Sequence, residues 1–205
     1  MKQSREVDLL FYFDGFQPAQ EEVLRNSLNL AFQAYNDYFS NNEPLKQCVK
    51  KYTTKDWIPY GGLGKSLATV DQQIAWAMTS TWFNFAWHAD TSTVIVINSA
   101  YIPSDGSSYT MGRVETIGTD AIANVSSSTY NDVNMNIFIN TVAIDSGHYN
   151  AHDFAGTIYH EFMHRKGFTH NSGYRGALIK ELGLCIAREN ADESLSLTWK
   201  PEMVD

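Results

Sequence analysis

Residues 156–170 read GTIYHEFMHRKGFTH and contain the pattern HExxHxxGxxH. His160 and His164 are four residues apart, so on a helix they differ by about 40° in direction and about 6 Å in height. Both imidazole rings could therefore converge on one metal ion. Glu161 points about 100° further round the helix than His160. From there its carboxylate could reach a water molecule on the ion without binding the ion itself.

Gly167 and His170 complete the pattern. Gly167 comes three residues after His164, where a helix that must stop and turn often has a glycine with positive φ. The turn would bring His170 up as a third nitrogen ligand. Three protein ligands and a position left for water are typical of a catalytic zinc, whereas structural zinc is usually closed by four ligands. The pattern therefore predicts one catalytic Zn²⁺ on His160, His164 and His170, with Glu161 as the general base.

The pattern at 160–170 resembles the signature of the metzincin clan of zinc endopeptidases, in which a turn containing methionine follows the motif. The resemblance implies an α+β fold with a twisted, mostly parallel sheet and two long helices in an upper subdomain, residues 1–167. A small helical lower subdomain, residues 168–205, would follow. The implied activity is a zinc metalloendopeptidase that hydrolyses peptide bonds in a polypeptide substrate.

One part of the clan signature is displaced in this chain. In metzincins the methionine turn usually precedes the last long helix, whereas the only methionine after His170 is Met203, which follows the last expected helix. Met203 is either the apolar floor beneath the zinc ligands or a sign that this feature is missing. Some metzincins carry a tyrosine near the metal, and by analogy Tyr174 is a candidate hydrogen-bond donor to the oxyanion. An ordinary surface tyrosine is the alternative.

Length and composition predict one globular domain over residues 1–205, which a single catalytic domain would fit. The 205-residue chain is 43% hydrophobic, which is enough to bury a core without disulfide or metal staples. Its net charge of −8, with only 15 lysines and arginines, argues against nucleic acid as a partner. Phosphate binding needs clustered basic residues. No stretch is long enough to predict a membrane span.

The compartment is left open by the sequence. The resemblance implies a secreted protein, but the apolar run at residues 9–13 is too short for the core of a signal peptide. The chain is therefore expected either to work inside a cell or to be a mature domain whose export and pro-segments have been removed. Cys48 and Cys185 would form one bridge in an exported protein and would stay buried thiols in an intracellular one.

The expected elements follow from periodicity and turn residues. A buried strand at 7–13 ends at Asp14-Gly15, and a helix with an apolar stripe begins near Pro18. Residues 45–53 suit either a strand or a short helix. The other expected elements are a buried strand at 93–98, an edge strand at 109–117, a strand at 134–142, the motif helix starting between 150 and 153, and a helix between 176 and 190. The resemblance assigns the edge strand to pairing with extended substrate.

The sequence also offers other ion sites and other functions. The loop at 103–108 offers one carboxylate, so a plain turn is favoured over a calcium site. His148 and His152 could hold a second ion, but solvated histidines are favoured. Two other functions stay open: a zincin-like binding or toxin domain that keeps the metal without catalysis, and a zinc amidase acting on a non-protein substrate.

Overall fold

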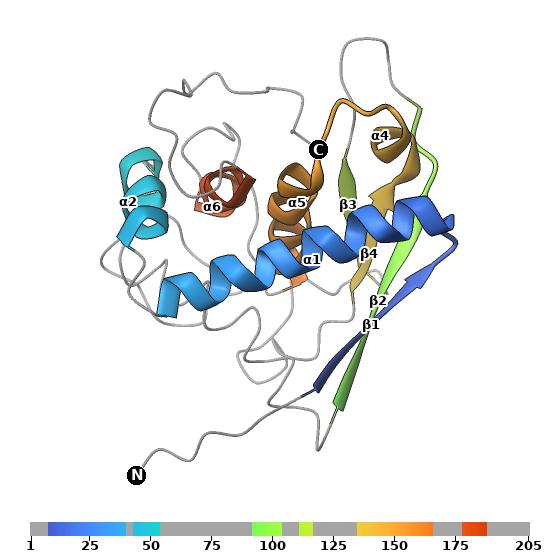
Figure 1. Cartoon of the computed structure of the whole chain (residues 1–205), viewed down its shortest axis with the longest axis horizontal. Helices are drawn as coiled ribbons and strands as arrows, with labels where there is room; N and C mark the ends of the chain where they lie inside the picture. The colour runs from blue at the N-terminus through green and yellow to red at the C-terminus, as the bar shows by residue number, and fades with distance from the viewer. Residues whose placement is uncertain are drawn as a thin grey trace.

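The computed structural model describes residues 8–39, 43–53, 92–103, 111–116, 135–165 and 178–187. These residues form a mixed α/β arrangement, drawn in Figure 1. In chain order the elements are β1 (Asp8–Asp14), α1 (Pro18–Phe39), α2 (Glu43–Tyr52), β2 (Ser92–Ala100), β3 (Gly112–Thr116), β4 (Met135–Asn140), α4 (Thr141–Asp145), α5 (Ala151–Arg165) and α6 (Leu178–Ala187).

The sheet has the strand order β1-β2-β4-β3. β1, β2 and β4 run parallel, with Phe11 opposite Ile95 and Ile97 opposite Ile137. β3 runs antiparallel to β4 and stands at the edge of the described sheet, with Val114 opposite Ile137. The expected mostly parallel sheet is therefore confirmed, and so is a strand within residues 109–117 at its edge.

The β1–α1 connection follows the expected turn chemistry. Gly15 has a φ of +80°, a conformation that other residues rarely adopt, and a side chain there would also collide with the hydroxyl of Ser99. α1 then buries an apolar stripe that includes Leu24 and Leu28. α1 packs chiefly against α5 (Ala151–Arg165), and the rings of Phe11 in β1 and Phe32 in α1 also meet edge to face at 5.8 Å.

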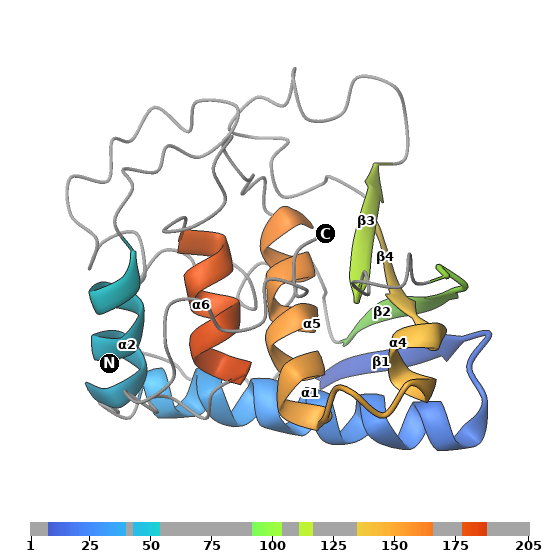
Figure 2. The ribbon, with the colours of Figure 1, turned by 90° about the horizontal axis from the view of Figure 1, so that it is seen from above.

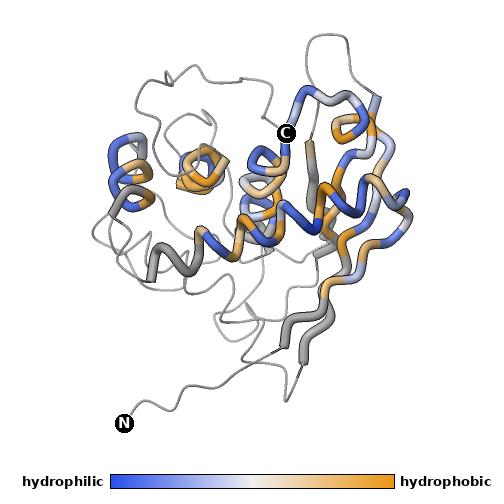
Figure 3. The backbone as a smooth tube through the Cα atoms, in the orientation of Figure 1, coloured by the Kyte–Doolittle hydropathy of each residue, from blue (hydrophilic) through white to orange (hydrophobic). Residues whose placement is uncertain are grey.

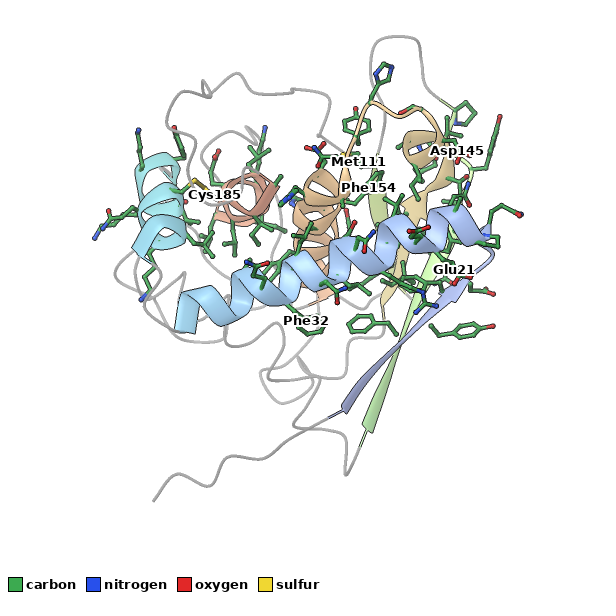
Figure 4. All side chains as sticks on the ribbon, viewed as in Figure 1. Glu21, Phe32, Met111, Asp145, Phe154 and Cys185 are labelled. Atoms are coloured by element: carbon green, nitrogen blue, oxygen red, sulfur yellow. A yellow bond between two sulfur atoms is a disulfide. The ribbon has the colours of Figure 1, made fainter. Side chains whose placement is uncertain are left out.

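Residues 45–53, which the sequence left open, are helical up to Tyr52. α2 buries Leu45, Cys48, Val49 and Tyr52, a three- and four-residue spacing that places them on one face of a helix. A disulfide joins Cys48 to Cys185 and so bonds α2 covalently to α6, as Figure 4 shows. Of the two alternatives for these cysteines, the structure therefore has the disulfide and not two reduced thiols.

Three helices form a row beside the sheet. Figure 2 shows α2, α6 and α5 side by side, with α1 running beneath them. α6 occupies the middle of the row and is apolar over most of its surface, as Figure 3 shows. All of its residues except Lys180 are buried. A helix that is buried on most sides needs neighbours around it, and α2 and α5 in the row supply two of them.

The expected last helix, between residues 176 and 190, is confirmed by α6. The expected boundary between subdomains, at 167 and 168, lies outside the described residues. α6 belongs to the expected lower subdomain and α2 to the upper one, so the disulfide joins these two parts of the chain. Among the helices that the structure describes, none combines the length and the apolar character needed to cross a bilayer.

Candidate metal centre on helix α5

α5 begins at a reciprocal cap. The side-chain oxygen of Asn150 accepts hydrogen bonds from the backbone amides of His152 at 2.9 Å and Asp153 at 3.1 Å. In return, the Asp153 carboxylate accepts a hydrogen bond from the backbone amide of Asn150 at 2.9 Å. This is the geometry of a capping box, built from Asn and Asp. It sets the start of the helix within the expected range of 150–153, so the motif residues lie in its last turns.

The apolar residues of α5 anchor it in the core. Phe154, Ile158 and Tyr159 are fully buried. The ring of Phe154 also meets that of Tyr149 edge to face at 6.3 Å. Phe154 and Ile158 are four residues apart and lie on the face of α5 that is buried, whereas the side chain of Phe162 lies outside the described residues.

His160 packs against α6. Its ring nitrogen Nδ1 lies 3.3 Å from the backbone carbonyl oxygen of Ile179, and only 8% of the residue is exposed. Four residues earlier on the same face of α5, Gly156 is in backbone contact with Gly183 of α6. The structure therefore places one side of the His160 ring against a neighbouring helix.

The contact with Ile179 determines the proton position on a neutral His160 ring. A carbonyl oxygen can only accept a hydrogen bond, so Nδ1 must carry the proton that it donates. A neutral imidazole has one N–H, which leaves the lone pair on Nε2. In a metal-ligating histidine, the N–H of the other ring nitrogen usually donates a hydrogen bond to a carboxylate or a backbone carbonyl in this way. The surroundings of His160 therefore fit a residue that binds a metal ion through Nε2.

Glu161 lies on a different face of α5. It follows Thr157 by one turn, and the side chain of Thr157 meets the start of the edge strand: its hydroxyl lies 3.6 Å from the sulfur of Met111. A side chain at Gly112 would approach the methyl group of Thr157 to 3.0 Å. Glu161 is 1% exposed, and glutamate is rarely so buried unless it has a partner or a function.

The remaining expected site residues are only partly described. His164 lies in α5, one turn after His160, but its side chain is outside the described part. His170, Tyr174 and Met203 lie wholly outside it, as do residues 104–108 of the loop considered for calcium. Among the side chains that the structure does place, no three His, Cys, Asp or Glu residues gather as metal ligands would, and this includes His148 and His152.

Three residues of this site were missed by sequence reasoning: Gly156, Ile179 and Gly183. Ile179 contributes its backbone carbonyl, which no side-chain pattern can reveal. Gly183 did carry a signal, because a glycine inside an apolar helical pattern often marks a close packing contact.

Comparison of the chain with protein-family models, with curated proteins and with solved structures finds no significant match.

Proposed function

We propose that this protein is a zinc-dependent endopeptidase of metzincin-like fold. The observation that carries the proposal is the pairing of motif and geometry at His160. The residues of HExxH lie on a capped, well-packed helix, and Nδ1–H of the first histidine donates a hydrogen bond to the Ile179 carbonyl, a contact that metal-ligating histidines usually make with their other ring nitrogen. A chance occurrence of the motif would not require that second feature.

The order of elements gives independent support. The parallel strand β4 leads through the short helix α4 into the motif helix, and the antiparallel strand β3 lies beside β4 at the edge of the described sheet. A mostly parallel sheet with an edge strand that can pair with substrate is what the metzincin resemblance implies. Extended polypeptides add to exposed strand edges through backbone hydrogen bonds, so β3 is suited to hold a peptide substrate next to α5.

His160, His164 and His170 are the residues that would hold the ion. When bound there, a zinc ion supplies the Lewis acid that polarises the scissile carbonyl and makes water acidic enough to attack near neutral pH. Glu161 removes a proton from the attacking water as its oxygen bonds to the carbonyl carbon. Glu161 then passes this proton to the leaving nitrogen as the C–N bond breaks. Tyr174 stays a candidate donor to the developing oxyanion.

The disulfide bears on the compartment. Disulfides persist in oxidising compartments and are rare in the cytosol, so the Cys48–Cys185 bond supports a protein that works after export. We therefore propose a secreted or otherwise exported enzyme.

The test combines digestion with metal analysis. The purified protein is incubated with a library of denatured proteins, with and without a chelator, and new termini are identified by mass spectrometry. We expect cleavage that the chelator abolishes. Glu161→Gln should abolish cleavage while zinc stays bound, and His160→Ala should lose zinc as well. Glu22→Gln, at an exposed position of α1, removes the same charge and should behave like the wild type.

Two outcomes would contradict the proposal. Full activity in Glu161→Gln would remove the general base from its assigned residue. Stoichiometric zinc without any new termini would instead favour a binding domain or an amidase for a non-protein substrate.

A further inference from the structure

We propose that α6 is a positioning element for the metal-binding nitrogen of His160, with Gly156 and Gly183 as the positioning residues. Their role is to bring the Ile179 carbonyl within hydrogen-bond distance of the histidine ring. The inference rests on the proposed function, because it assumes that Nε2 of His160 binds the ion.

The two glycines allow the backbones of α5 and α6 to touch. A side chain at Gly156 would collide with the carbonyl oxygen of Gly183. A side chain at Gly183 would approach the carbonyl oxygen of Gly156 to 3.0 Å and the Cβ of His160 to 3.5 Å. A side chain at Gly156 would therefore have to push the helices apart, whereas a methyl group at Gly183 would require its neighbour to move by a few tenths of an ångström.

The crossing also sets the register between the helices. Gly156 meets Gly183, and one turn away His160 meets Ile179, so the two helices pack in opposite directions. His160 follows Gly156 by four residues and Ile179 precedes Gly183 by four, which keeps each pair on one face of its helix. The glycine contact and the hydrogen bond to His160 are therefore parts of one interface.

Gly183 has a second effect through its missing side chain. In a helix the side chain of a residue lies close to the carbonyl four positions earlier, which is why Ser and Thr can hydrogen-bond that carbonyl. A glycine at 183 therefore leaves the Ile179 carbonyl uncovered on the side facing α5. That oxygen has two lone pairs and can accept from the histidine ring in addition to the helix hydrogen bond.

α6 is held on its opposite face by the disulfide. Cys185 follows Gly183 by two residues, which on a helix is about 200° further round. Its bond to Cys48 joins α6 to α2 on the side away from α5, and Figure 1 shows α6 between these two helices. α6 is therefore restrained from both sides, and the Ile179 carbonyl is held at a constant position relative to His160.

The test uses Gly183→Ala. An added methyl group would cover the Ile179 carbonyl and shift α6 away from His160, while the better helix propensity of alanine offsets part of the lost packing. Loss of a partner of this kind typically weakens metal binding by about 10- to 100-fold. We expect that loss in zinc affinity, measured by competition with a chromophoric chelator, with little change in thermal unfolding. Ile97→Val, a mildly destabilising change in the interior of β2, should leave zinc affinity unchanged.

A spectroscopic measurement keeps the proposal testable even if the variant does not fold. Nitrogen NMR of the metal-free wild type, at a pH where the ring is neutral, should show His160 protonated at Nδ1. A ring protonated at Nε2, or a Gly183→Ala protein with wild-type zinc affinity, would overturn the role of α6. Retention of zinc by His160→Ala would instead show that the proposed metal site itself is wrong.

Discussion

Removal of the Cys48–Cys185 disulfide should cost a large part of the stability of this protein. The bond joins residues 137 positions apart, so it closes a long loop in the unfolded chain. Loop-closure theory gives an entropy of about −2.1 − 1.5R ln n cal/mol/K, which for a loop of this length is about −17 cal/mol/K. At 25 °C this corresponds to about 5 kcal/mol, at the upper end of what disulfides contribute.

The perturbation is a Cys48→Ala, Cys185→Ala double variant. For a protein of this size, about 5 kcal/mol corresponds to a fall in Tm of about 10–20 °C. Urea and thermal unfolding followed by circular dichroism would measure it, with the wild type kept oxidised. The denatured variant is also freed from its cross-link, so its m-value should rise, because more surface is exposed on unfolding.

The single variants provide the control. Each one removes the whole bond, so Cys48→Ala and Cys185→Ala should each be destabilised nearly as much as the double variant rather than half as much. Equal unfolding midpoints for wild type and double variant would refute the entropic reasoning. Peptide mapping that finds two free thiols in the native protein would refute the bond itself.

Three further variants probe the helix that carries the motif. Asn150→Ala removes the acceptor that caps α5 and should cost about 1 kcal/mol in urea unfolding; an unchanged midpoint would show that the cap is not needed. Phe154→Ala leaves a cavity beneath the same helix and should cost about 3–5 kcal/mol by the same measurement. Gly112→Ala crowds Thr157 and should move β3 away from α5. On the proposed function this variant should raise KM for a peptide substrate without releasing zinc. Simultaneous loss of zinc would contradict a role of β3 in substrate binding alone.

Much of the fold could be predicted from the sequence because its signals are local. The turn at Asp14-Gly15 ends β1, since Gly15 takes up a φ that favours glycine. The β-branched run at 93–98 lies within β2, and the start of α5 follows from residues that can cap a helix. In each of these cases the residues that decide the element are its own neighbours in the chain.

The ambiguous stretch at 45–53 shows where local signals stop. Its apolar residues suit a strand or a short helix until something decides which of them face inward. In the structure Leu45, Cys48, Val49 and Tyr52 do so, and Cys48 is bonded to a residue far along the chain. The choice is made by tertiary packing, which overrides propensity in short segments.

The candidate site could likewise be predicted from the sequence only in part. The residue types at His160 and Glu161, and their spacing, could be predicted because a helix converts sequence separation into direction. The partner of the His160 ring could not, since it is a backbone carbonyl brought close by two glycines on separate helices. Which nitrogen of a histidine is available to an ion depends on such a contact, and every residue has the same carbonyl group.

The geometry of α5 gives its two motif residues different neighbours. Gly156 and His160 share the face that α6 covers, whereas Thr157 and Glu161 share the next face, where Thr157 meets Met111, directly before β3. Because one residue along a helix turns its direction by about 100°, adjacent motif residues can be held by two different elements, one before and one after α5 in the chain. On the proposed function, α6 positions the ligand and β3 positions the substrate beside the base. The two helix faces then allow metal binding and substrate binding to be altered independently.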